Sequence, residues 1–366
     1  MKHEHILVIR FSALGDVAMT VPIIWALARQ YPDVRITMLS RPIARTFFED
    51  LAPNVSFMGA DVKVEYHGMH GLNALYRRLA AKQFTAIADL HNVLRSEYLR
   101  FRFNVGRYRV EHIDKHRNLR HQLTAKQPKK ILKQLPTSFQ NYIDVFARLG
   151  YPIAPENLCF RSMFTLPDSD NVPCGGNLNL LAKAIGPKLS WERWIGIAPY
   201  AMYDGKTYPI ALMEQVIEQL MARYPKARIF LFGRGDKEDK TFKEWTAKWS
   251  QCLYVGEHTE NLYQELIIMS HLDVMVSMDS SNMHMASLTN TPVVSIWGAT
   301  HPYAGFLGWG QSKENIVELP DLNCRPCSIY GQKKCLRNDY ACLHGIKPGT
   351  IIEKVCAVLD NTTTQP

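Results

Sequence analysis

The sequence lacks any apolar run that approaches the roughly 18 residues needed to span a bilayer. Its first residues, MKHEHILVIRF, also lack a long apolar core and a small-residue cleavage site. We therefore expect a first β-strand there and not a signal peptide. These absences argue against a membrane-spanning or secreted protein, and we expect a cytoplasmic one.

Two common phosphate-binding patterns are also missing. The tripeptide GKT at 205–207 suggests a Walker motif, but the first glycine of that motif would fall on Tyr200. The stretch FGRGDKED (232–239) contains GxG without the third glycine of a dinucleotide fingerprint. No DxD pair stands in a suitable loop, so we expect chemistry that needs no catalytic metal.

Acidic residues are scarce in one segment, 95–133, which holds twelve Lys and Arg against three Asp and Glu. The difference of nine equals the net charge of the whole chain, +9, so the remaining residues are neutral overall. Such a block is commonly a solvated face. Alternatively, it is a surface for an anionic partner, such as a phosphorylated substrate, an anionic membrane or nucleic acid.

The rest of the chain alternates between apolar strands and amphipathic helices. Buried parallel strands are expected at 4–10, 34–40, 54–59, 84–91, 194–200, 227–233, 252–256, 272–278 and 291–298. A helix is expected over 16–30, and a segment rich in Pro, Gly and Asn (151–177) is the best linker. The alternation predicts an α/β protein with two doubly wound parallel-sheet domains that face a central cleft. Ligands bind beyond the carboxyl ends of such strands.

Asp16 follows Gly15 at the first strand-to-helix turn. A carboxylate there commonly caps the helix, because it accepts hydrogen bonds from the free N–H groups of the first turn. The alternative is a general base that faces the cleft, since the small residues Ser12, Ala13 and Gly15 would let a substrate approach closely. The sequence leaves both readings open.

Two further turns carry polar residues. Lys206 stands just before a predicted helix, where it is either a surface lysine or a ligand for phosphate. The stretch SMDSSNMHMAS (277–287) follows a buried strand and opens a helix with hydroxyl groups, a carboxylate and a histidine. Hydroxyls and backbone N–H groups in that position suit a diphosphate, so we expect a ligand site there.

Four cysteines lie close together near the carboxyl end of the sequence: Cys324, Cys327, Cys335 and Cys342. Their spacing is loose for a zinc ribbon, although CxxC with two further cysteines is a common zinc pattern. A structural zinc site, free thiols and disulfides remain open, and disulfides are the least favoured in a reducing compartment. We expect no catalytic role for these residues and no required cofactor.

Four stretches together resemble glycosyltransferase family 9, the ADP-heptose:lipopolysaccharide heptosyltransferases. They are ILVIRFSALGDVAMTVPII (6–24), DLHNVLRS (89–96), KTYP (206–209) and SMDSSNMHMASLTNTPVVSIWGATHP (277–302). The resemblance runs over nearly the whole chain in matching order. It implies a GT-B fold with two Rossmann-like domains: an acceptor-binding domain over 1–175 and a nucleotide-sugar-binding domain over 176–346. A final helix, 347–366, would pack back towards the first domain.

The resemblance also implies roles for individual residues. Asp16 matches the family's general base, which removes the proton of the acceptor hydroxyl. The residues that would bind the donor are Lys206, Glu238, Asp279, Ser280, Ser281 and His284, with Asp236 as an equal choice to Glu238. The expected reaction is inverting transfer of a heptose, with ADP-heptose as the expected donor, to a lipopolysaccharide core. We expect Arg95, Arg117 and Arg120 to bind the anionic acceptor beside the inner face of the cytoplasmic membrane.

Two other functions remain as alternatives. A nucleotide-sugar 2-epimerase would use the same fold, but it would leave the basic segment unexplained. A nucleic-acid-binding module would use that segment, in which Tyr98, Phe101, Phe103 and Tyr108 are interleaved with the basic residues. Stacking and charge alone would not require the polar turn at 277–287, so we expect no nucleic-acid partner.

Overall fold

The computed structural model describes residues 4–166 and 171–363, and it divides into two compact units. Unit 1 comprises residues 1–116 and 136–163, and unit 2 comprises residues 117–135 and 164–366. The division therefore falls at 163/164, earlier than the domain boundary expected at 175/176, and it places residues 117–135 with unit 2. Part of the expected linker, 167–170, lies outside the described residues, as does the end of the expected final helix, 364–366.

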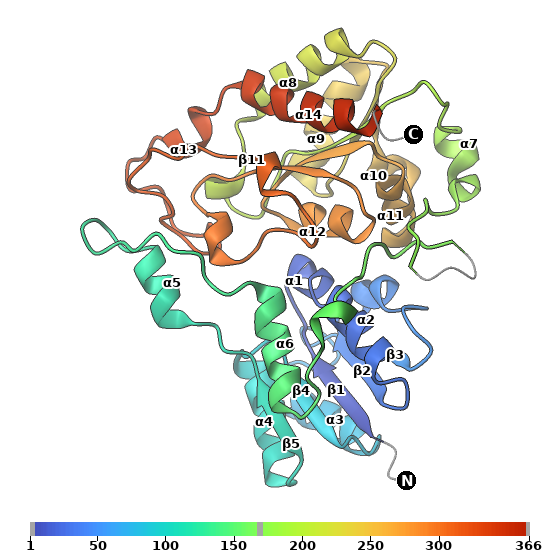
Figure 1. Ribbon diagram of the computed structural model, residues 1–366, viewed down its shortest axis with the longest axis vertical. Helices are drawn as coiled ribbons and strands as arrows, with labels where there is room; N and C mark the ends of the chain where they lie inside the picture. The colour runs from blue at the N-terminus through green and yellow to red at the C-terminus, as the bar shows by residue number, and fades with distance from the viewer. Residues whose placement is uncertain (1–3, 167–170, 364–366) are drawn as a thin grey trace. The chain divides into compact units, whose positions relative to one another are not determined.

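The sheet of unit 1 has five parallel strands in the order β3-β2-β1-β4-β5 (Figure 1). Their bounds are β1 His5–Ile9, β2 Arg35–Ser40, β3 Val55–Gly59, β4 Ala86–Asp89 and β5 Arg109–His112. The central strands are continuous apolar runs because helices cover both of their faces. Strand β5 has the sequence RVEH, and its charged side chains suit the exposed edge of a sheet.

The helices of unit 1 differ from expectation at one place. They are α1 Leu14–Ala18, α2 Val21–Gln30, η1 Pro42–Phe47, α3 Gly68–Ala80, α4 Leu94–Val105, α6 Ser138–Arg148 and η2 Pro155–Asn157. The single helix expected over 16–30 is thus wrong, because two helices meet at residues 19–20. Pro22 stands in the first turn of α2, where its missing N–H is tolerated, and the Thr20 hydroxyl bonds the Val17 carbonyl at 2.7 Å.

The sheet of unit 2 has six parallel strands in the order β11-β10-β9-β6-β7-β8. Their bounds are β6 Trp194–Ala198, β7 Arg228–Leu231, β8 Cys252–Tyr254, β9 Val274–Met278, β10 Val293–Ile296 and β11 Ile316–Val317. Every residue of β6, β9 and β10 is buried. The expected strands of this half are confirmed, and β11, with two residues, is an addition.

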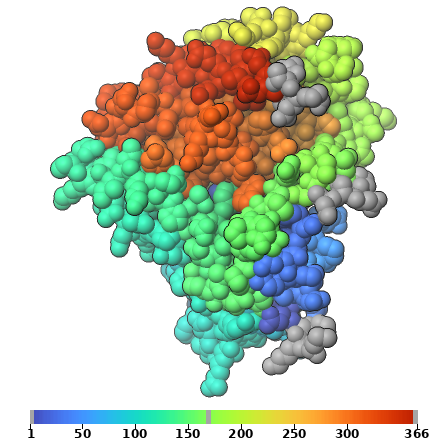
Figure 2. All heavy atoms as spheres, in the orientation of Figure 1, coloured from blue at the N-terminus to red at the C-terminus, as the bar shows by residue number. Residues whose placement is uncertain are grey.

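The helices of unit 2 complete the alternation of strand and helix. They are α5 Arg117–Leu123, η3 Leu178–Leu181, α7 Ala182–Ile185, η4 Asp204–Lys206, α8 Ile210–Arg223, α9 Asp236–Lys248, α10 Val255–His258, α11 Leu262–Ser270, α12 Ser281–Leu288, η5 Pro302–Ala304, η6 Lys313–Asn315, α13 Ala341–His344 and α14 Pro348–Thr363. Helix α14, red in Figure 2, contacts α8 and the strands β9, β10 and β11 of its own unit. Across the described residues, we find no helix with the length and apolarity that a bilayer crossing demands.

Each sheet brings its functional loops to one edge, because parallel strands all end on the same side. In unit 1 this edge carries the loops that follow β1 and β4, since Ile9 is in register with Asp89. In unit 2 it carries the loops that follow β6, β7, β9 and β10. The basic segment 95–133 is not one surface loop, since it contains α4, β5 and α5 and is shared between the two units.

Candidate active site

The carboxylate of Asp16 has a cap-like contact and an ion pair at the carboxyl edge of unit 1. Its Oδ2 accepts a hydrogen bond from the backbone N–H of Ala13 at 3.0 Å, which is the helix-capping arrangement. The same oxygen lies 2.8 Å from a guanidinium nitrogen of Arg10, at the end of β1. Arg10 is buried and also donates to the carbonyl of Leu90, so it joins the loops after β1 and β4. The carboxylate keeps 24% of its surface exposed, so it remains within reach of a ligand.

His91 lies beside this pair, in the loop after β4. Its Nε2 is 3.4 Å from the Ser12 hydroxyl, and its buried Nδ1 has no hydrogen-bond partner among residues 4–166 and 171–363. Burial, together with the positive charges of Arg10 and Lys115, lowers the pKa of His91 to about 3. The ring is therefore neutral near pH 7, and it can donate or accept a proton in a hydrogen bond without adding charge.

Asp89, the last residue of β4, fixes the loop that carries His91 through hydrogen bonds to its backbone. Its Oδ1 accepts hydrogen bonds from the backbone N–H groups of His91 and Asn92, both at 2.9 Å. Arg100 of α4 lies 3.5 Å from the other carboxylate oxygen, and the Asp89 side chain is fully buried. Asp89 thus positions the loop and has no surface available to a ligand.

Lys206 and Asp279 form the centre of the polar cluster in unit 2. The lysine Nζ lies 3.5 Å from Asp279 Oδ2, and their side chains are 14% and 7% exposed. Gly331, with φ at +84°, lets the lysine stem pass, because a Cβ there would lie 2.5 Å from Lys206 Cγ. The ammonium group is thus directed by packing on its stem and by an aspartate.

The start of α12 lies beside this pair. Ser280 is the N-cap residue of α12, its hydroxyl is 3.4 Å from the Ser277 hydroxyl, and Ser281 is the first helical residue. His284 follows in the first turn of α12 and is buried. Since Asp279 directly follows β9, the structure brings Lys206, Asp279, Ser280, Ser281 and His284 to one edge of the sheet. Free backbone N–H groups at a helix start suit a phosphate.

The Glu238 side chain packs against Gly233 and Gly235 in the turn that follows β7. A Cβ on Gly235, where φ is +144°, would lie 2.9 Å from Glu238 Oε2, so the carboxylate folds onto this turn. Asp236, the other choice for this role, is exposed at the start of α9. No sequence pattern singles out Arg234, which donates to Glu265 Oε1 at 2.8 Å and to the Thr259 carbonyl at 3.0 Å. Burial raises the pKa of Glu265, against the lowering effect of Arg234.

The three arginines expected to bind the acceptor have different surroundings. Arg95 is exposed in α4 of unit 1, and Arg117 is exposed in α5 of unit 2. Arg120, also in α5, donates to the Tyr330 hydroxyl, and its guanidinium carbon lies 5.4 Å from the ring centre of Phe306. Packing on these rings holds α5 against unit 2.

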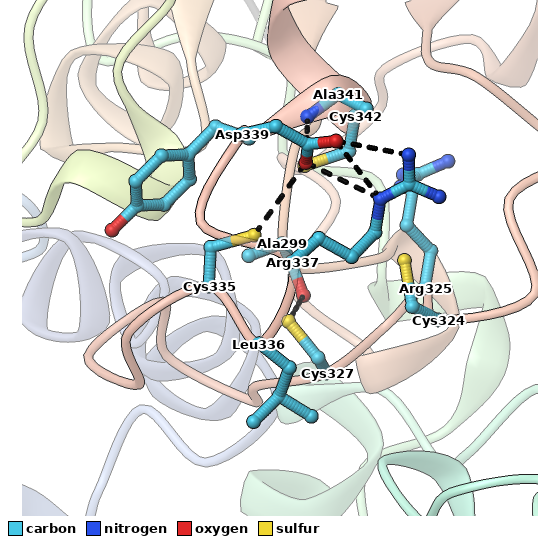
Figure 3. Close-up of a pocket in the computed structure, with 11 residues that line it drawn as sticks. Ala299, Cys324, Arg325, Cys327, Cys335, Leu336, Arg337, Asp339, Ala341 and Cys342 are labelled. Atoms are coloured by element: carbon cyan, nitrogen blue, oxygen red, sulfur yellow. Dashed lines mark hydrogen bonds and ion pairs between the residues drawn. The ribbon is translucent and has the colours of Figure 1, made fainter.

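The four cysteines line one small cavity of about 20 Å³, together with Asp339 (Figure 3). Cys335 Sγ lies 4.0 Å from an oxygen of Asp339, and burial raises the pKa of Cys342 to about 11. Sulfur ligands suit zinc. Within the described part of the chain, however, no three His, Cys, Asp or Glu side chains are already arranged to hold a metal ion.

Comparison with known proteins decides the family. The model of glycosyltransferase family 9 (heptosyltransferase) matches residues 72–336. The chain belongs to glycosyltransferase family 9. This confirms the resemblance and makes the protein a glycosyltransferase, which favours transfer over the epimerase alternative.

Individual relatives of this family 9 glycosyltransferase align with it from end to end. Lipopolysaccharide heptosyltransferase 3 of Escherichia coli is 22% identical over 361 residues, which cover 96% of this chain and 98% of the relative. The structure of E. coli ADP-heptose lipopolysaccharide heptosyltransferase II has a TM-score of 0.66 at 18% identity and covers 98% of this chain and 100% of its own. E. coli heptosyltransferase WaaC with ADP has a TM-score of 0.62 at 15% identity, with coverages of 97% and 99%. These similarities confirm the GT-B fold, with two Rossmann-like domains.

Proposed function

We propose that this glycosyltransferase moves a heptose from ADP-heptose to an acceptor sugar of a lipopolysaccharide core. Family membership supports the heptosyl group, and the relative named lipopolysaccharide heptosyltransferase 3, which aligns over nearly its full length, supports the acceptor. The solved complex of a family relative with ADP supports the nucleotide. The observation that carries the proposal is the Lys206–Asp279 pair beside the start of α12, because it combines a cation with free N–H groups for a diphosphate.

In the proposed reaction, an acceptor hydroxyl oxygen attacks the anomeric carbon of the donor sugar. The bond from that carbon to the diphosphate oxygen breaks, and the electron pair leaves with ADP. Asp16 takes the hydroxyl proton, Lys206 and the N–H groups of α12 stabilise the leaving diphosphate, and Asp279 holds sugar hydroxyls. A base on the face opposite the leaving group inverts the anomeric configuration. Fixed cations and N–H groups can stabilise such a leaving group without a metal.

The role of Asp16 is tested with Asp16→Asn. Asparagine can still accept the Ala13 hydrogen bond, so the helix cap is retained while the base is lost. We expect turnover to fall by at least about 100-fold, the usual contribution of a general base, while the dissociation constant for ADP stays within twofold. Asp33→Asn, at an exposed residue of the same unit, is the matched control. Near-normal turnover of Asp16→Asn would leave this carboxylate as a helix cap only.

Lys206→Ala tests the donor site, with the exposed Lys226→Ala as its control. We expect calorimetry to give weaker ADP binding for Lys206→Ala and unchanged binding for Lys226→Ala. Equal affinities of the two variants for ADP would show that Lys206 does not bind the donor.

We also propose that exposed arginines of the segment 95–133, Arg95 and Arg117 among them, bind the anionic core and the inner face of the cytoplasmic membrane. Each Lys or Arg near an anionic surface contributes about 1 kcal/mol. Co-sedimentation with vesicles containing phosphatidylglycerol should decrease in the double variant Arg95→Gln/Arg117→Gln. Equal sedimentation of this variant and the wild type would contradict the proposal.

A structural zinc at Cys324, Cys327, Cys335 and Cys342 is a separate proposal. Four cysteines that line one small cavity support it, and their side chains would have to rotate inward to bind the ion. Elemental analysis should find about one zinc per chain, lost in Cys327→Ser/Cys342→Ser. A zinc-free protein with unchanged stability would identify these residues as plain thiols.

A further inference from the structure

Unit 1 contains a hollow that the proposed reaction does not use. It has a volume of about 350 Å³ and lies between β2, β3, η1 and the last turn of α3. We name it the β3 groove, and its lining includes the side chains of Thr37, Arg45, Ser56, Phe57, Arg78 and Lys82. Its volume is within the range of about 300–1,000 Å³ that is typical of small-molecule sites.

The β3 groove is distinct from the Asp16 site. Thr37 is in register with Leu7, which lies two residues before the end of β1. At about 3.3 Å per residue, Thr37 is therefore about 7 Å along the strand direction from the end of β1, after which the loop of the Asp16 site begins. Lys82 follows the carboxyl end of α3, and Arg45 belongs to the 3-10 helix η1. None of the residues that line the groove belongs to the loops after β1 or β4.

A row of polar side chains forms the floor of the groove across three strands. His5 Nε2 lies 2.8 Å from the Thr37 hydroxyl, which lies 2.9 Å from the Ser56 hydroxyl. The next side chains on the same strand faces, Leu7, Leu39 and Met58, belong to the hydrophobic core. A polar row in this position needs internal hydrogen bonds, whereas apolar residues would pack without them. The row thus places the hydroxyl groups of Thr37 and Ser56 on the lining of the groove.

Three cations stand around this floor. Arg45 and Lys82 have no Asp or Glu oxygen within 4.0 Å in the part of unit 1 that is described. Arg78 donates to the Tyr66 hydroxyl at 2.6 Å and lies 3.9 Å from the exposed carboxylate of Glu65. Like charges that converge on one hollow repel each other, and an anion bound between them would remove this repulsion.

The aromatic ring in the groove is already covered. Phe57 stacks on Phe48 with ring centres 5.9 Å apart and an interplanar angle of 12°, and the Arg45 guanidinium carbon lies 5.2 Å from its centre. Phe48 and the Arg45 guanidinium thus already occupy stacking positions on this ring, which disfavours a nucleobase there. Sugar hydroxyls suit the floor better, since they exchange hydrogen bonds with Thr37 and Ser56.

We propose that the β3 groove binds a phosphorylated saccharide. Its phosphate group contacts Arg45, Arg78 and Lys82, and its sugar hydroxyls bond the row formed by Thr37 and Ser56. The inference concerns binding alone, and it holds whether or not Asp16 is the general base. The probe is a soluble sugar phosphate, and vesicles of phosphatidylglycerol test the alternative that a phospholipid headgroup supplies the phosphate.

Calorimetry on the full chain, in low-salt buffer with excess ADP, tests the proposal with glucose 6-phosphate, glucose and inorganic phosphate. ADP competes for the phosphate site at Lys206, so binding there is suppressed, and the comparison with the groove variant shows what the groove contributes. The groove variant combines Arg45→Gln, Arg78→Gln and Lys82→Gln. The control combines Lys63→Gln, Arg77→Gln and Lys226→Gln, three exposed residues outside the groove, and changes the net charge equally.

We expect the wild type and the control to bind glucose 6-phosphate within twofold of each other, and the groove variant to bind it at least tenfold more weakly. Glucose should give no measurable binding. Thr37→Val/Ser56→Ala should reduce the affinity for glucose 6-phosphate to that for inorganic phosphate, whose own affinity stays unchanged. Asp16→Asn should bind glucose 6-phosphate normally, which separates this test from that of the transfer reaction.

Three outcomes would overturn the proposal. Equal binding of glucose 6-phosphate to the wild type and the groove variant would exclude the groove as the site. Equal affinity of the wild type for glucose 6-phosphate and inorganic phosphate would leave no role for the saccharide. Groove-dependent binding to vesicles of phosphatidylglycerol, without binding of glucose 6-phosphate, would identify a phospholipid headgroup as the ligand instead.

Discussion

The ion pair between Arg10 and Asp16 should contribute measurably to stability as well as orienting the carboxylate. Arg10→Met removes the guanidinium while keeping a side chain of comparable length, and it leaves Asp16 without this partner. Breaking a fully buried ion pair costs about 3–5 kcal/mol, whereas exposed pairs contribute about 0–1 kcal/mol. With side chains 9% and 24% exposed, this pair is intermediate. We therefore expect a coupling energy of about 1–3 kcal/mol.

Urea unfolding of four proteins measures this coupling: the wild type, Arg10→Met, Asp16→Asn and the double variant. Arg10→Met also loses the hydrogen bond to the Leu90 carbonyl, but that loss occurs on both sides of the cycle and cancels. The double variant should be more stable than the sum of the single losses predicts, because it also lacks the carboxylate that loses its ion pair in Arg10→Met. A coupling below about 0.5 kcal/mol, the level of independent sites, would refute the reasoning.

Three other predictions concern His91, Gly331 and Cys342. The folded pKa of His91, about 3, is far below the unfolded value of 6.5, so the stability from its neutral form is present above pH 6.5 and is lost as the pH falls towards 3. Between pH 6 and pH 4, the free energy of unfolding in urea should fall by up to about 1.4 kcal/mol per pH unit in the wild type, and His91→Gln should lack this decrease. An equal pH dependence of the two proteins would contradict this prediction. Gly331→Ala should weaken ADP binding more than Gly186→Ala does, because both have positive φ but only a Cβ at 331 meets Lys206; similar affinities would refute it. Cys342 is buried and its pKa is raised to about 11, so it should react with iodoacetamide at pH 7.5 far more slowly than exposed Cys159 does. Peptide mass spectrometry of chelator-treated protein measures both rates, and equal labelling would show that the Cys342 thiol is accessible.

The sequence predicts the framework well where burial dictates composition. Strands such as β1, β6 and β9 are continuous apolar runs, because parallel strands are buried on both faces. Strand β5, RVEH, and strand β11, with two residues, have no such run, so hydrophobic pattern alone does not reveal them. The break between α1 and α2 was missed because apolar spacing continues through it.

The site is predicted in part. Asp16, Lys206 and Asp279 lie in segments that follow strands, where topology alone indicates a ligand edge. Their partners are harder to find, since Arg10 reads as the last residue of a strand and His91 belongs to a loop some 80 residues away. The resemblance places Lys206 and Asp279 on one ligand, but their mutual 3.5 Å contact depends on the packing of η4 against Gly331. That packing has no signature in the sequence.

Residues 117–135 make the two units discontinuous. They are fastened to unit 2 by the bond from Leu135 N–H to the Tyr303 carbonyl and by Lys130, which donates to the carbonyls of Cys324 and Pro326. The polypeptide consequently passes from one unit to the other three times, at 116/117, 135/136 and 163/164. A single cut at 163/164 would leave residues 117–135, which belong to unit 2, on the fragment that contains unit 1. Neither unit can therefore be produced intact as one contiguous fragment. To produce the two units separately, residues 117–135 would have to be moved to the fragment of unit 2, and residues 116 and 136 would have to be joined.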